Sequence, residues 1–159
     1  ELNIRNSLFE SNYSDQIDLD YCNGTIEDSR FVYKVKKTNN NGDGLDISGS
    51  IIVANNNKYK YFPDKGISVG ENSLIYINSN SFIGNNSGVA VKDLSKAYLV
   101  QNKFYNNITD LSLYQKKQIY GGGNAYVDDR NLKVTKDVKS KVEYHNTTYI
   151  KNKYKKDIR

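Results

Sequence analysis

Five aspartates gather in two short segments of the sequence, SDQIDLD and GDGLD, which lie 28 residues apart. The first segment holds Asp15, Asp18 and Asp20, and the second holds Asp43 and Asp46. Carboxylate oxygens are the ligands that Ca²⁺ prefers in proteins. A pair of carboxylates can also supply the acid and the base that hydrolyse a glycosidic bond. Either chemistry requires the fold to bring the two segments side by side.

Three interpretations of this acidic cluster stay open. In the first, Asp18, Asp43 and Asp46 hold a Ca²⁺ ion, which could also bridge to an acidic sugar. In the second, two of the carboxylates act as acid and base on a glycosidic bond. In the third, the carboxylates form a solvated ladder that hydrogen-bonds to the neighbouring backbone. Because adjacent carboxylates repel, one of them should have a raised pKa unless a cation or a basic side chain lies between them.

Two later segments, DKGISVGENS and SGVAVKDLS, bring lysines to the same region of the pattern. Lys65 and Lys92 are these lysines, and the acids Glu71 and Asp93 follow them. A lysine among carboxylates forms salt bridges, which raise its pKa and keep it charged. It can act as a base only where its surroundings lower the pKa instead.

The four segments repeat one pattern, and their central apolar residues define its period. These residues are Ile17, Leu45, Ile67 and Val89, separated by 28, 22 and 22 residues, and Leu111 continues the series after another 22. An aromatic position keeps the same period, with Phe9, Phe31, Tyr59, Phe82 and Phe104 at intervals of 22, 28, 23 and 22. A fixed period in the twenties is typical of a solenoid, in which each repeat is one coil stacked on the last.

Alternation within each strand assigns the directions of its side chains. We expect one outward column on successive coils, with neighbours about 4.8 Å apart, formed by Asp18, Asp46, Ser68, Ala90 and Ser112. A second column should contain Asp15, Asp43, Lys65, Ser87 and Thr109. A polar position two residues before each aromatic predicts a ladder of side chains in register, formed by Ser7, Ser29, Asn57, Asn80 and Asn102.

The one long interval has a local explanation. Between Phe31 and Gly42 the sequence VYKVKKTNNN is about six residues longer than its counterparts. In a solenoid such an insertion forms a loop on one face, often the functional one.

The pattern fades after Tyr114, so we expect repeats over 1–115 and an irregular capping segment over 116–159, within one domain. NAYVDD, LKVTKDV and KVEYHNTTYI resemble irregular strands in this segment. Residues 130–159 carry ten Lys or Arg and three acids, a net charge of +7, so the rest of the chain carries −2. We interpret this basic tail as a solvated surface, and no aromatic-rich signature of RNA binding accompanies it.

With these repeats in place, DGLDISGS, DKGISVGENS and GVAVKD resemble right-handed parallel β-helix proteins of the pectate-lyase-like class. The resemblance covers about residues 1–115 and implies an all-β solenoid of about five coils of roughly 22 residues. The class includes polysaccharide lyases, uronan C5-epimerases, glycoside hydrolases, phage tailspikes and surface adhesins.

This resemblance implies a domain that binds or modifies an acidic polysaccharide, by lyase or epimerase chemistry assisted by Ca²⁺. In that chemistry a cation neutralises the uronate carboxylate and a base removes the C5 proton. The catalytic candidates are Lys65 and Lys92, and the candidates for substrate binding are Asp15, Asp20, Glu71 and Asp93. The alternative is a non-catalytic structural or adhesive β-helix within a larger surface protein or tailspike.

Other features bound the context of the chain. One cysteine excludes an intrachain disulfide, and no apolar run reaches the length of about 18 residues that a membrane span needs. The class implies an extracellular or cell-envelope location. The sequence opens on repeat-like residues with neither Met nor a signal peptide. We therefore expect it to be part of a longer polypeptide.

Overall fold

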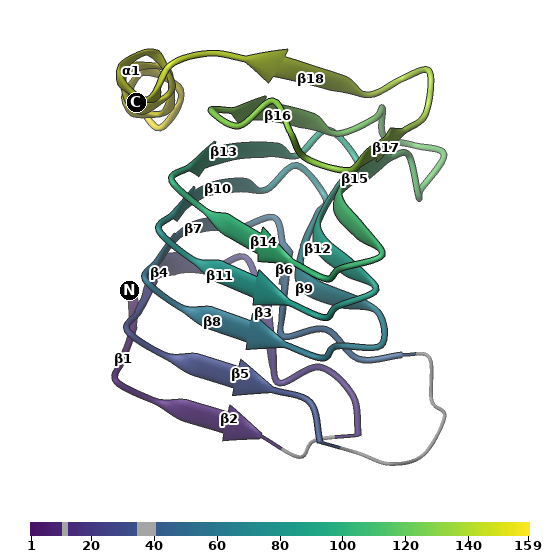
Figure 1. Ribbon diagram of the computed structural model, residues 1–159. Coiled ribbons are helices and arrows are strands. Elements are labelled where there is room, and N and C mark those ends of the chain that lie inside the picture. Colours follow the sequence, from purple (N-terminus) through teal and green to yellow (C-terminus); the bar gives the residue numbers. More distant parts are fainter. Residues whose placement is uncertain (11–12, 35–40) are drawn as a thin grey trace.

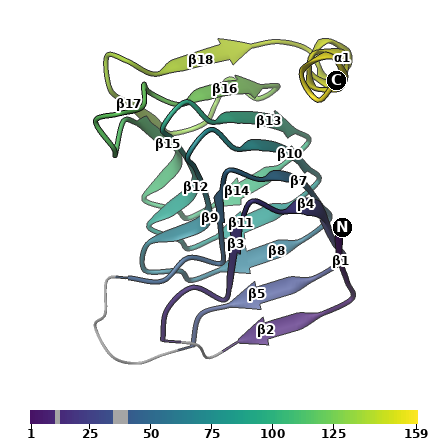
Figure 2. The same ribbon diagram turned by 180° about the vertical axis from the view of Figure 1, so that it is seen from behind.

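Three parallel sheets form a solenoid in the computed structural model, which describes residues 1–10, 13–34 and 41–159 (Figures 1 and 2). Sheet A contains β1 (Leu2–Arg5), β4 (Asn23–Glu27), β7 (Ile51–Asn55), β10 (Leu74–Asn78), β13 (Lys96–Val100), β16 (Asn124–Val127) and β18 (Lys141–Tyr144). Sheet B contains β2 (Leu8–Glu10), β5 (Arg30–Val32), β8 (Lys58–Lys60), β11 (Ser81–Ile83) and β14 (Lys103–Tyr105). Sheet C contains β3 (Ile17–Asp20), β6 (Leu45–Ser48), β9 (Lys65–Gly70), β12 (Ser87–Lys92), β15 (Thr109–Tyr114) and β17 (Val134–Lys136).

The strands stack in the register that the sequence predicts. Within the described residues, five complete coils follow one another, each giving one strand to each sheet. In sheet C, Ile17 pairs with Leu45, which in turn pairs with Ile67. The apolar members of these columns point inward and form one continuous buried core along the solenoid. The prediction of a right-handed parallel β-helix is confirmed.

The predicted amide ladder runs between sheets A and B. The Asn57 backbone N–H donates to Oδ1 of Asn80 (2.8 Å), and the Asn80 N–H donates to Oδ1 of Asn102 (2.9 Å). Below them, the Ser29 N–H donates to Oδ1 of Asn57 (2.9 Å). Each side chain therefore satisfies a backbone group of the coil beneath it. Because these backbone N–H groups are hydrogen-bonded, the turn can be buried.

The aromatic column stacks inside the solenoid, as its period predicts. Ring centroids are 4.9 Å apart for Phe9 and Phe31, and 4.7 Å apart for Phe31 and Tyr59. The stack continues from Tyr59 to Phe82 at 5.2 Å and from Phe82 to Phe104 at 4.9 Å. Near-parallel rings at this spacing bury large apolar surfaces and hold successive coils in register.

Glycines begin the strands of sheet C where the coils approach one another most closely. A Cβ atom at Gly66 would lie 2.6 Å from the carbonyl oxygen of Gly88, and one at Gly88 would lie 2.7 Å from that of Asp110. A side chain is therefore excluded at these bends. The insertion of the second coil lies between β5 and β6, and its residues 35–40 fall outside the described part of the chain.

The C-terminal segment differs from the expected irregular strands in its last part. The parallel ladders continue through β16, β17 and β18, and α1 (Thr147–Asp157) replaces the second half of KVEYHNTTYI. Asn146 caps this helix by accepting a hydrogen bond from the Tyr149 N–H (2.9 Å). Ile150 is buried with Tyr98 and Tyr126 on the outer face of sheet A. Figure 1 shows α1 beside β18, at the opposite end of the stack from β2.

Candidate functional site

The outer face of sheet C brings together side chains from consecutive coils. Asp18 pairs in register with Asp46, and Asp46 pairs with Ser68, as the outward column predicts. The column continues through Ala90, which pairs with Ser112. Ser68 and Ala90 are fully buried although they point outward, so neighbouring side chains cover the middle of this face.

Lys65 at the start of β9 is held by two carboxylates. Its ammonium pairs with Asp64 and lies 3.5 Å from Oδ1 of Asp43. Burial works to lower the pKa of Lys65, but the charge of Asp43 and the hydrogen bond to Asp64 outweigh it. The pKa is raised as a result, and Lys65 stays a cation.

Lys92 at the end of β12 lies in a different environment, although it belongs to the same face. It is only 4% exposed, and no described residue forms an ion pair with it. A Cβ atom at Gly70 would lie 3.4 Å from Cε and 3.7 Å from Nζ of Lys92, so the side chain crosses this glycine towards β6. Burial lowers the pKa of Lys92, although the charge of Asp46 opposes the shift.

Tyr114 stands next to Lys92 in the ladder between β12 and β15. Burial raises its pKa, the positive charge of Lys65 opposes this, and the negative charges of Asp64 and Asp43 add to it. The phenol therefore remains protonated at neutral pH. Its pKa responds to the charge of Lys65 and to the charges of the two carboxylates that pair with Lys65. Sequence reasoning missed Tyr114, although the column that contains Lys92 leads directly to it.

Asp15 and Asp43 form hydrogen bonds with the backbone of the next coil. Oδ1 of Asp15 accepts from the Asp43 N–H (2.7 Å), and Oδ1 of Asp43 accepts from the Lys65 N–H (2.9 Å). This geometry matches the ladder interpretation of the acidic cluster for these two residues. Burial is the main cause that raises the pKa of Asp43 to about 7, and the charge of Lys65 opposes it.

Asp18, Asp20 and Asp46 lie at the more exposed end of the same face, on β3 and β6. Burial first, and then the charges of Asp46, Asp20 and Asp15, raise the pKa of Asp18. This mutual repulsion is what the sequence predicts for adjacent carboxylates. Among the described residues, no three acidic, His or Cys side chains are arranged so that they could hold a metal ion. The donor set therefore falls short of a formed Ca²⁺ site, which needs six to eight oxygen ligands.

Glu71 and Asp93 lie on the turns that leave sheet C. Hydrogen bonding to Lys117 lowers the pKa of Glu71, with smaller contributions from Ser48 and from the charge of Lys92. Asp93 is 1% exposed, and its Oδ1 accepts the backbone N–H groups of residues 116 (2.7 Å) and 117 (2.9 Å). Glu71 thus borders the site around Lys92, whereas Asp93 holds the following loop in place.

The three-sheet solenoid and its ladders define the class of protein as a right-handed parallel β-helix. A family model described as a right-handed beta helix region matches residues 1–154, and the chain belongs to this family. Searches of curated proteins and of solved structures found no match. Within the described residues, no helix has the length and apolar character needed to cross a membrane.

Proposed function

We propose that the outer face of sheet C binds an acidic polysaccharide and that Lys92 removes a proton from it. The observation that supports this proposal is the contrast between the two lysines. Lys65 is ion-paired and has a raised pKa, whereas Lys92 is buried without an ion pair among the described residues and has a lowered pKa. A lysine that acts as a base must be neutral near pH 7, so its pKa must be lowered. A lysine that binds an anion must stay positively charged, so its pKa must remain high.

In this proposal, Lys65, Lys92 and Tyr114 each have one role in an elimination reaction. Lys65 attracts the uronate carboxylate, and neutral Lys92 takes the C5 proton. The bond between C4 and the glycosidic oxygen breaks as the new double bond forms, and the protonated Tyr114 hydroxyl supplies the proton that the leaving oxygen accepts. If the glycosidic bond stays intact and a proton returns to the opposite face of C5, the outcome is epimerisation. No step is assigned to Ca²⁺. An extracellular or cell-envelope location fits a polymeric substrate and belongs to the same proposal.

A non-catalytic adhesive or structural β-helix is the second candidate. It is favoured by the hydrogen bonds of Asp15 and Asp43, which are committed to the backbone of neighbouring coils, and by the ion pairs of Lys65. In this alternative the charged face sets the register of the coils and holds a polymer without changing it.

The experiment incubates the protein with several uronic-acid polymers, with Ca²⁺ and with a chelator. Ultraviolet absorbance reports unsaturated ends, and proton exchange at C5 in deuterated water reports epimerisation. Lys92→Met removes the base and keeps the aliphatic stem, whereas Lys92→Arg keeps a charge that cannot be given up near neutral pH. We expect both variants to lose turnover and Lys92→Arg to keep polymer binding. Lys103→Met, at an exposed lysine of sheet B, controls for the loss of one positive charge.

The outcomes separate the two candidates. Binding without unsaturated ends or exchange on any polymer supports the adhesive candidate and rejects the catalytic role of Lys92. Turnover that survives both Lys92 substitutions rejects Lys92 as the base. If no uronate polymer binds the protein, the proposal is wrong.

A further inference from the structure

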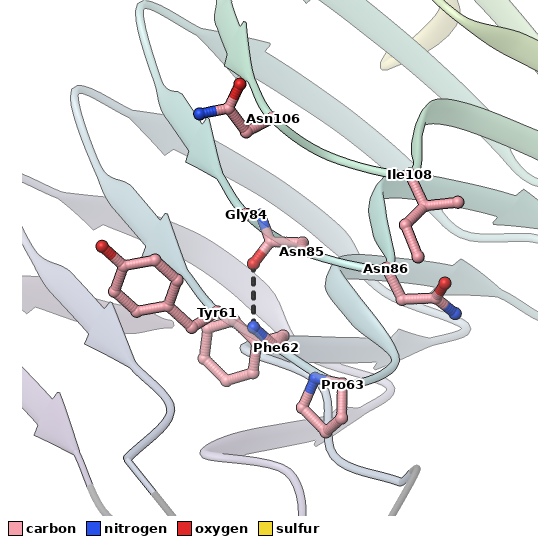
Figure 3. A pocket seen from close by; sticks show the side chains of 8 residues that line it. All are labelled: Tyr61, Phe62, Pro63, Gly84, Asn85, Asn86, Asn106 and Ile108. Atoms are coloured by element: carbon pink, nitrogen blue, oxygen red, sulfur yellow. Dashed lines mark hydrogen bonds between the residues drawn. The ribbon is translucent and has the colours of Figure 1, made fainter.

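We infer a second binding site, for a neutral sugar chain, in a hollow of 440 Å³ on the turns between sheets B and C (Figure 3). Eight residues line it: Tyr61, Phe62, Pro63, Gly84, Asn85, Asn86, Asn106 and Ile108. None of them is charged, and none belongs to the lysine face of sheet C. This inference rests on its own observations and does not depend on the proposed function.

Three consecutive coils create the hollow at equivalent positions of the turn. Tyr61, Gly84 and Asn106 have left-handed backbone conformations, with φ values of 65°, 65° and 55°. Tyrosine adopts this conformation rarely, so the backbone of the turn sets the place of the Tyr61 ring. Gly84 has no side chain, so a gap opens between Tyr61 and Asn106. A Cβ atom at Gly84 would lie 2.9 Å from Cδ1 of Tyr61.

Asn85 forms a rigid floor between the two sides of the hollow. It is 1% exposed, and its Oδ1 accepts the Phe62 N–H (3.0 Å), the bond drawn in Figure 3. Its Nδ2 donates to the Tyr59 carbonyl (3.2 Å) and to Oδ1 of Asn107 (3.1 Å). This floor is fixed before any ligand arrives, which reduces the entropy cost of binding.

The sides of the hollow combine exposed apolar surfaces with free amides. Tyr61 and Asn106 lie along one side, and Ile108 and Asn86 lie along the other (Figure 3). Tyr61 is 56% exposed and Ile108 is 75% exposed. The side-chain amides of Asn86 and Asn106 have no hydrogen-bond partner among the described residues, in contrast to that of Asn85.

These groups match the chemistry of a neutral sugar. The face of a pyranose ring presents C–H groups that pack on an aromatic ring, and its edge presents hydroxyls. Each amide offers both donors and acceptors to such hydroxyls. A charged ligand would find no counter-charge among the lining residues, and a wholly apolar ligand would leave the amides unpaired.

Binding of neutral oligosaccharides to the intact chain tests this site. An array of gluco-, manno-, galacto- and N-acetylglucosamine oligomers is probed first, and each positive is titrated by calorimetry. Tyr61→Asn removes the ring, and asparagine readily adopts the left-handed backbone conformation of this position. Asn106→Gly removes a side-chain amide, and glycine adopts the same backbone conformation without strain. We expect Tyr61→Asn to raise Kd at least about fivefold, the value of a modest aromatic contact. Asn106→Gly should also weaken binding.

Tyr21→Asn is the matched control. Tyr21 is 84% exposed, has a φ of 53°, and lies over Gly49, whose added Cβ atom would be 2.7 Å from the ring. It repeats the local arrangement of Tyr61 and Gly84 but does not line the hollow. Equal losses in Tyr21→Asn and Tyr61→Asn would overturn the site, as would a failure of every neutral oligomer to bind. Unchanged Kd values in both Tyr61→Asn and Asn106→Gly would also overturn it.

Discussion

Replacing Asn80 by alanine tests whether the amide ladder carries the stability of the solenoid. Asn80 is fully buried, and its Oδ1 accepts the Asn57 N–H while its Nδ2 donates to the Ala54 carbonyl (2.9 Å). Alanine leaves the Asn57 N–H buried without a partner and removes one hydrogen bond from the Ala54 carbonyl, which lies within the ladder of β7. We expect a large loss of stability because the Asn57 N–H cannot reach water in the folded chain.

The size of the loss follows from these two contacts. Each buried polar group left unpaired costs about 1–3 kcal/mol, and the missing amide leaves a small cavity in addition. The lost bond to the Ala54 carbonyl adds about 1 kcal/mol, so Asn80→Ala should lower the free energy of unfolding by about 2–5 kcal/mol. For a chain of this length, each kcal/mol corresponds to roughly 2–4 °C in Tm, so the midpoint should fall by about 4–20 °C.

Urea and thermal unfolding followed by far-ultraviolet circular dichroism measure this loss. Asn78→Ala is the matched control, since Asn78 is two residues earlier on the outer face of sheet A and its amide donates only to Oδ1 of Asn55 (2.8 Å). This control should cost less than about 1 kcal/mol. Equal losses in the two variants, or a loss below about 1 kcal/mol for Asn80→Ala, would refute the reasoning.

Two further predictions concern the bend and the acidic cluster. Gly88→Ala places a methyl group 2.7 Å from the Asp110 carbonyl oxygen and 2.9 Å from the Phe104 ring, and should cost at least about 2 kcal/mol in urea unfolding; an unchanged midpoint would contradict this. The pKa of Asp43 is raised from 3.8 to about 7, so between these values the folded chain binds more protons than the unfolded chain. Stability from this group is therefore greatest below pH 3.8 and is lost as pH rises through about 7, and Asp43→Asn should flatten that slope. A variant that keeps the wild-type slope would show that another group titrates.

The coils could be predicted from the sequence because each column places the same kind of residue at the same position of every coil. Asn57, Asn80 and Asn102 share a role that only their spacing reveals, and the structure confirms it. Helix α1 could not be predicted by the same reasoning, because it occurs once. Ile150 is its single buried residue, so its apolar face is too weak to stand out among the lysines.

The sequence predicted where the two lysines of the candidate site lie, but it did not predict that their pKa values shift in opposite directions. The columns place Lys65 and Lys92 on one face, yet neighbouring acids were expected to raise the pKa of both. Of the two, only Lys65 forms an ion pair with a described residue, whereas the Lys92 side chain crosses Gly70 towards β6 without reaching ion-pair distance of a described carboxylate. Alternation likewise assigns Ser68 to the outer face but cannot tell that other side chains cover it.

The coils differ in burial, and this difference predicts which backbone amides exchange with solvent most slowly. Strands β1, β2 and β3 have no fully buried residue, whereas every residue of β12 is buried. Since each coil is stabilised mainly by its neighbours, amide hydrogens should exchange slowest around β9 and β12. Lys92 is therefore attached to the slowest-exchanging part of the backbone. A ligand on that face therefore meets a surface whose geometry persists while less buried parts of the backbone exchange.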